Sequence, residues 1–243
     1  MTQLYRDHGI VLRTYKLGEA DRIVVFITRD HGKVRAVAKG VRKTKSKFGS
    51  RLEPMSHVAV QFYEGRGELD IVTQVDSVDH FRPIRDDLDR IARGSAMVEA
   101  VDQMAQDREP NPRLYQMLLG ALRALAGNNG PLVVPAFFWK LLALEGLQPQ
   151  LNECVLCGEV PPLTPLVAFD LEAGGALCAG CRRGRRITPE ALALMQQILG
   201  GQLGSALNEP VSQATHEVEH LATEAMEHHL ERRLKSVTLI DLG

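Results

Sequence analysis

The sequence predicts an α+β protein in which a small N-terminal β-barrel is followed by helices, with a metal-binding segment between two of them. Three observations carry this prediction. Five short β-type segments occupy residues 1–80, the hydrophobic spacing becomes helical from about Arg82, and all four cysteines fall into two C-x-x-C pairs. With 243 residues and 44% apolar content, the chain is long enough to bury substantial cores.

The N-terminal segments are β-branched or alternate between apolar and polar residues. They cover residues 10–14, 22–28, 32–39, 58–63 and 68–73. Glu64–Gly67 reads as a hairpin turn because of its two glycines, and one long connection separates the third segment from the fourth. Five strands with this connection fit a Greek-key barrel of the OB type, which binds oligonucleotides through its sheet face and loops. A sandwich fragment or an SH3-like barrel fits the strand count nearly as well.

The remaining chain shows three- and four-residue apolar spacing between breaks made by proline and glycine. Helices are expected near residues 82–104, 113–126, 134–147 and 212–235, with another beginning after Thr188. Thr188 precedes Pro189, the usual order of an N-cap and a first helical residue. The segment at 134–147 is apolar nearly all round, as a buried central helix should be.

The long connection belongs to a stretch, Lys33–Leu52, that holds eight basic residues and no acidic one. Such a run repels itself, and a polyanion relieves the repulsion while releasing condensed counterions. Nucleic acid is the usual polyanion, although a solvated loop without a partner is the alternative. The basic residues are Lys33, Arg35, Lys39, Arg42, Lys43, Lys45, Lys47 and Arg51.

Charge is distributed unevenly along the chain. Residues 1–80 hold 14 Lys and Arg against 10 Asp and Glu, whereas residues 151–243 hold 7 against 12. A basic first third joined to an acidic last third indicates modules with different partners. Within the basic stretch, Phe48 is the favoured candidate for a base-stacking ring, ahead of Tyr63, which lies outside it.

The cysteine pairs, Cys154 with Cys157 and Cys178 with Cys181, are separated by 20 residues. This is the spacing of a structural zinc site in which two knuckles complete a tetrahedron. Four thiolates around one Zn²⁺ leave no coordination position for a substrate, so the expected role is structural. Two redox dithiols or unrelated free thiols are the alternatives. The basic cluster that follows, Arg182–Arg186, either contacts phosphate or offsets nearby negative charge.

A second metal pattern, His216-Glu217-Val218-Glu219-His220, matches the H-E-x-x-H motif of zinc proteases. On a helix, the two histidines fall on the face opposite the apolar residues, which argues against a ligand role in a walled cleft. No apolar run approaches the roughly 18 residues needed to span a bilayer. The N-terminus lacks the apolar core of a secretory signal, so a cytosolic protein is expected.

An ordered series of short motifs resembles the DNA repair protein family RecO. It comprises Leu17–Arg22, Thr28 with Gly32-Lys33, Ala38–Lys43, Ser46–Phe48, Leu52–Pro54 and Gly67–Leu69, and continues with Tyr115, Ala136–Gly146 and the cysteine knuckles. The four cysteines resemble the zinc-containing branch of that family. The resemblance implies an OB-fold domain over 1–80 and a helical domain over 81–243, interrupted by a zinc-ribbon-like module over 151–187.

The resemblance also implies a function. RecO proteins are mediators without small-molecule turnover that bind single- and double-stranded DNA and anneal strands coated by single-strand-binding protein. With RecR, and with RecF in some pathways, they help load RecA. The implied DNA contacts are the basic residues above together with Phe48, with Arg13, Lys16 and Arg22 as further candidates. The implied partners include the C-terminal tail of single-strand-binding protein, and the implied location is the nucleoid.

Two other functions remain open from the sequence. One is a zinc-ribbon protein that binds RNA or acts in transcription. The other is a zinc hydrolase built on His216 and His220, against which the helical angles and the lack of a third ligand weigh.

Overall fold

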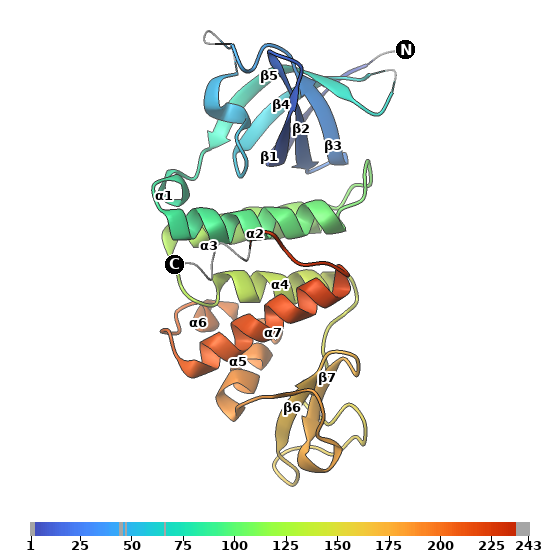
Figure 1. Ribbon diagram of the computed structural model, residues 1–243, viewed down its shortest axis with the longest axis vertical. Coiled ribbons are helices and arrows are strands. Elements are labelled where there is room, and N and C mark those ends of the chain that lie inside the picture. The colour runs from blue at the N-terminus through green and yellow to red at the C-terminus, as the bar shows by residue number, and fades with distance from the viewer. Residues whose placement is uncertain (1–2, 44–45, 47, 66, 237–243) are drawn as a thin grey trace. The chain divides into compact units, whose positions relative to one another are not determined.

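The protein is described by a computed structural model that covers residues 3–43, 46, 48–65 and 67–236 (Figure 1). It divides into two compact units, Met1–Gly127 with Leu234–Gly243, and Asn128–Arg233. The first unit joins the barrel to the first helices of the helical region. The compact units and the predicted domains therefore divide the chain at different points.

The first unit contains a closed five-stranded barrel with strand order β1-β2-β3-β5-β4, which confirms the predicted OB-like fold. All neighbouring strands are antiparallel except β3 and β5, and β4 returns to β1. The strands are β1 (Leu4–Leu17), β2 (Asp21–Thr28), β3 (Gly32–Ala38), β4 (His57–Tyr63) and β5 (Asp70–Asp79).

Closure depends on β1, whose 14 residues pair with β2 on one side and β4 on the other. A register shift between Val11 and Arg13 bends this strand, as a bulge does at the corner of a barrel. Alternate side chains of each strand then point inward. The buried core comprises Val11, Val24, Phe26, Val34, Ala36, Ala38, Phe48, Leu52, Val58, Val60, Phe62, Val72 and Val75.

Helices α1 (Arg82–Arg85), α2 (Leu88–Met104) and α3 (Pro112–Gly127) complete the first unit. The side chain of Asp87 caps α2 by accepting a hydrogen bond from Arg90 N. His57 Nε2 on β4 lies 2.7 Å from Tyr115 Oη on α3. Burial lowers the pKa of His57 to about 4, so the ring is neutral near pH 7.

The loop between α2 and α3 reaches back to the barrel. Arg108 Nη2 lies 2.7 Å from Asp70 Oδ1, and the Tyr5 hydroxyl donates to the other oxygen of the same buried carboxylate. Arg108 N also donates to Lys33 O at 3.0 Å. Because the Asp70 carboxylate is fully buried and satisfied, these contacts fix the loop against β3 and β5.

The second unit combines four helices with a three-stranded sheet of order β7-β6-β8. Its helices are α4 (Val133–Leu144), α5 (Pro189–Leu199), α6 (Leu203–Ala206) and α7 (Gln213–His229), and its strands are β6 (Leu166–Asp170), β7 (Gly175–Cys178) and β8 (Arg185–Arg186). As predicted, α4 is buried and Thr188 caps α5. Helix α7 ends six residues before the predicted Lys235. No helix in the described part of the chain is long and apolar enough to cross a membrane.

Candidate nucleic-acid interface and metal centre

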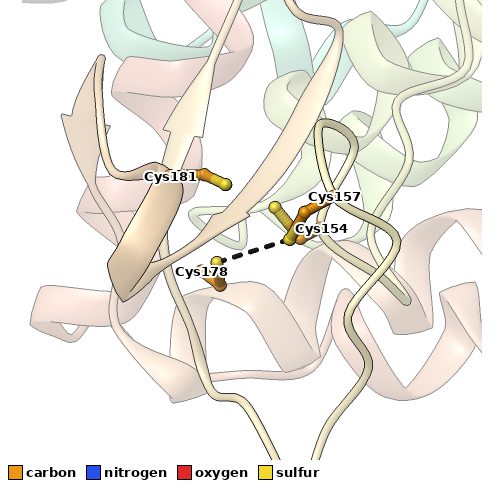
Figure 2. Close-up of side chains that lie close together, drawn as sticks. All are labelled: Cys154, Cys157, Cys178 and Cys181. Carbon is orange, nitrogen blue, oxygen red and sulfur yellow. Dashed lines mark hydrogen bonds between the residues drawn. The ribbon is translucent and has the colours of Figure 1, made fainter.

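The four cysteines meet at one point of the second unit, as Figure 2 shows. Their sulfur atoms all lie within 4.8 Å of one another, and Cys157 Sγ is 3.7 Å from Cys178 Sγ. A tetrahedral site with metal–sulfur distances of about 2.3 Å has sulfur–sulfur edges of about 3.8 Å. The cluster therefore fits a metal ion held by four thiolates.

Two tight turns bring each pair of cysteines together. In the first, Gly158 N donates to Cys154 O at 2.8 Å, and Gly158 adopts a φ of 75°, which favours glycine. In the second, Cys178 ends β7 and the 3₁₀ turn η2 (Ala179–Cys181) carries the chain round to Cys181. A backbone hydrogen bond links the two turns: Val155 N in the first turn donates at 3.0 Å to Ala176 O on β7, the strand that leads into the second.

Without an ion, the electrostatics of the cluster favour a thiolate at Cys154 and disfavour further thiolates at Cys157 and Cys181. Burial raises the pKa of Cys154, but backbone N–H groups of Cys178, Cys157 and Leu156 outweigh it and bring this pKa to about 6. The neighbouring sulfurs of Cys157 and Cys178 raise the pKa of Cys181 to about 12. Four thiolates repel one another, and a divalent cation among them would relieve that repulsion.

Two residues of the predicted DNA interface, Lys33 and Arg35, form ion pairs with Asp107 within the first unit. Lys33 is buried, and its Nζ donates to Asp102 O at 2.9 Å and lies 3.5 Å from Asp107 Oδ1. Arg35 Nη2 lies 3.1 Å from Asp107 Oδ2. Lys33 therefore does not fit the predicted role of a DNA contact, and the charge of Arg35 is partly compensated.

The predicted base-stacking role of Phe48 is wrong, because its ring is buried. Its ring is only 1% exposed and packs with Leu52 in the barrel core. The 3₁₀ turn η1 (Gly49–Leu52) follows it, so the end of the basic stretch turns two apolar side chains inward. Stacking on a base requires an exposed ring face, and Phe48 offers none. Arg51, between them, is half-buried and donates from Nη1 to Phe48 O at 3.5 Å.

The exposed cations of the stretch lie at the turn between β1 and β2. Arg42 N donates to Ala20 O at 2.9 Å and its Nη1 to Gly18 O at 3.1 Å, while Gly40 N donates to an Asp21 oxygen. Lys39, Arg42 and Lys43 are exposed, and no carboxylate of the described residues forms an ion pair with them. Lys45 and Lys47 lie outside the described residues.

The other sequence candidates lie elsewhere. Within the cluster Arg182–Arg186, Arg183 Nε is 3.1 Å from Asp170 Oδ2 and Arg185 pairs with Glu224. His216 and His220 are exposed on α7, as the helical angles predicted. Among the described residues, the cysteine cluster is the one group with metal-binding geometry.

One exposed aromatic residue of the barrel, Tyr15, is missing from the predicted interface. It is 43% exposed near the end of β1, beside the β1–β2 turn. The loop between β3 and η1, residues 39–48, contacts this turn through Arg42 and is called the basic loop below. The sequence around Tyr15 makes Arg13, Lys16 and Arg22 candidate DNA contacts but gives no signal for Tyr15 itself. Only the pairing of β1 with β2 reveals what surrounds it.

Two family models match the chain. Residues 1–81 match the model described as "Recombination protein O N terminal", and residues 85–238 match "Recombination protein O C terminal". Together the matches extend over nearly the whole chain. The first ends two residues after β5, so it coincides with the barrel.

Proposed function

We propose that this chain, which belongs to the RecO family of DNA repair and recombination proteins, is a non-enzymatic mediator. In this role it binds DNA and anneals complementary strands. The observation that carries the proposal is the exposed set of Lys39, Arg42 and Lys43 on an OB-like barrel, where no carboxylate of the described residues forms an ion pair with them. Cations on flexible side chains hold a strand through its phosphates and leave the bases free to pair. The same contacts bind single and double strands.

The family further suggests the partners. We expect RecR and the C-terminal tail of single-strand-binding protein to bind this chain, RecF to join in some pathways, and the assembly to load RecA onto coated strands. The cellular location that goes with these partners is the cytoplasm, at the nucleoid.

The metal is proposed to be one structural Zn²⁺ held by Cys154, Cys157, Cys178 and Cys181. Support comes from the donor set, since thiolates favour zinc among common structural metals and the sulfur separations suit its tetrahedron. When bound, the ion supplies a fixed crosslink between the two knuckles. The protein residues themselves place the four sulfurs, and backbone N–H groups donate hydrogen bonds to the sulfur of Cys154.

Strand annealing is the activity that tests the proposal. Adding the protein to complementary oligonucleotides coated with single-strand-binding protein should accelerate pairing at least tenfold, with no nucleotide triphosphate present. The expected reason is that backbone contacts raise the local strand concentration without fixing the bases. An unchanged pairing rate, together with preferential binding to structured RNA, would instead favour the zinc-ribbon RNA-binding alternative.

A further inference from the structure

A row of apolar side chains, one from each strand, crosses all five strands of the barrel in register. Tyr15 pairs with Ile23 on β2, Ile23 with Val37 on β3, Val37 with Ile71 on β5, and Ile71 with Tyr63 on β4. We call these five residues the tyrosine row, after the aromatic residue at each end. No sequence motif connects them, because the row exists only once the five strands have paired.

The tyrosine row faces away from the barrel core. Successive side chains of a strand point to opposite faces, and Val24, Ala36, Val72 and Phe62, which adjoin the row along their strands, all belong to the buried core. Tyr15 is 43% exposed and Tyr63 is 37% exposed, with the three aliphatic residues half-buried between them.

The remainder of the outer face of β1 and β2 is covered. Val25 and Ile27, the next outward-facing residues of β2 after Ile23, are fully buried, and α3 packs on this part of the barrel. The helices of the first unit thus cover this part of the outer face, whereas both ends of the tyrosine row stay exposed. An open apolar strip beside charged residues is typical of a binding surface.

Tyr15 is held in place from one side. The Arg13 guanidinium carbon lies 4.8 Å from the centre of the Tyr15 ring, and Arg13 Nε is 2.7 Å from Asp102 Oδ2 on α2. The anchored guanidinium occupies one face of the ring, so the exposed part belongs to the other face and edge. A ring fixed in this way loses little side-chain entropy when a second flat group stacks on it.

Charge distinguishes the two ends of the row. At the Tyr15 end, Lys16 is exposed on the same strand, and the exposed cations Lys39, Arg42 and Lys43 lie on the loop that contacts the β1–β2 turn. These four cations outnumber the exposed carboxylate of Glu19 in that turn. At the Tyr63 end, the next residue is Glu64, and Glu68 lies across the β4–β5 turn. A polyanion would therefore be drawn to the Tyr15 end.

We propose that the tyrosine row is a base-stacking surface for single-stranded DNA, with Tyr15 as its principal platform and Tyr63 as a weaker one. This inference rests on the proposed function and deepens it. The cations of the basic loop hold the phosphates of any strand, whereas the row contacts bases that are exposed only when a strand is unpaired. The row thus gives the barrel a preference for single strands, and pairing of the bases releases them from it.

The test compares Tyr15→Ala with wild type on three labelled probes: an oligothymidylate, an abasic strand of the same length, and a duplex. Tyr15→Ala should lose about 5- to 140-fold in affinity for oligothymidylate, since that is the range for one stacked base. Affinity for the abasic strand and the duplex should stay unchanged, and so should the salt slope. Tyr63→Ala should show the same pattern with a smaller loss.

Two control variants accompany the test. Tyr15→Phe keeps a flat ring and should retain wild-type affinity. Val78→Ala removes an apolar side chain that is 49% exposed on β5 but lies outside the row, and it should change nothing.

Two results would overturn the inference. If Tyr15→Ala binds all three probes as wild type does, bases do not stack on the row, and the strip is left to a protein partner. If all three affinities fall equally, Tyr15 acts through the fold or the backbone contacts. These results differ from the result expected if the proposed DNA binding itself is wrong. In that case wild-type protein would bind neither the oligothymidylate nor the abasic strand.

Discussion

Replacing Arg42, Lys43, Lys45 and Lys47 together with glutamine is expected to weaken binding to single-stranded DNA on the order of 100-fold at about 0.15 M salt. Each neutralised phosphate contributes about 0.7 to the log–log salt slope, so four lost contacts should flatten that slope by about 3. Arg42 and Lys43 are exposed and lack a carboxylate partner in the described part of the chain. The loss should be the same for every base sequence, because these side chains contact phosphates.

A matched control variant distinguishes an effect of the loop charges from an effect of the net charge of the protein. Arg113, Arg123, Arg232 and Arg233 are four exposed cations outside the barrel, and replacing them with glutamine changes net charge by the same amount. This variant should bind DNA as wild type does. Equal losses in both variants, or unchanged affinity in the loop variant, would show that the loop is not the main DNA contact.

The second large effect is expected at the metal centre. Cys154 is buried, and serine at this position removes one of the four ligands of a closed site. Structural zinc contributes about 10–16 kcal/mol to folding in zinc-finger peptides, which matches or exceeds the whole stability of a typical domain. Cys154→Ser should therefore abolish metal retention and render residues 151–187 sensitive to protease, as measured by metal analysis and limited proteolysis.

The exposed histidines provide the control for this variant. His216→Ala with His220→Ala should keep about one zinc ion per chain, because neither residue belongs to the cysteine cluster. DNA annealing by the remaining folded Cys154→Ser protein should be largely kept, since the proposed DNA contacts lie in the other compact unit. Metal retained in Cys154→Ser would contradict the four-thiolate site, and annealing lost in a well-folded variant would contradict a purely structural role.

Local patterns were enough to predict most of the fold. Alternation and turn residues located all five strands, apolar spacing located the longer helices, and the C-x-x-C spacing located the cysteine cluster that the structure forms. These features depend on residues close in sequence, or on a metal geometry with few solutions. The OB-like arrangement followed from one further clue, the long connection between the third and fourth strands.

The composition of the site depended on contacts between distant residues. Lys33 and Arg35 belong to a basic run in sequence, but the fold brings Asp107 beside both of them. Phe48 sits among lysines, yet η1 turns it into the barrel core. Tyr15 becomes part of a surface through strand pairing with Ile23 and through the parallel pairing of β3 with β5. A linear charge pattern contains none of this information.

The most direct test of the central claim is the binding of wild-type protein to a labelled single-stranded oligonucleotide across a salt series. If the barrel holds DNA through its phosphates, the logarithm of the association constant should fall linearly with the logarithm of salt concentration. The slope should be several times −0.7 and alike for unrelated base sequences. An absence of binding at about 50 mM salt, or an affinity that does not change with salt, would contradict the electrostatic account.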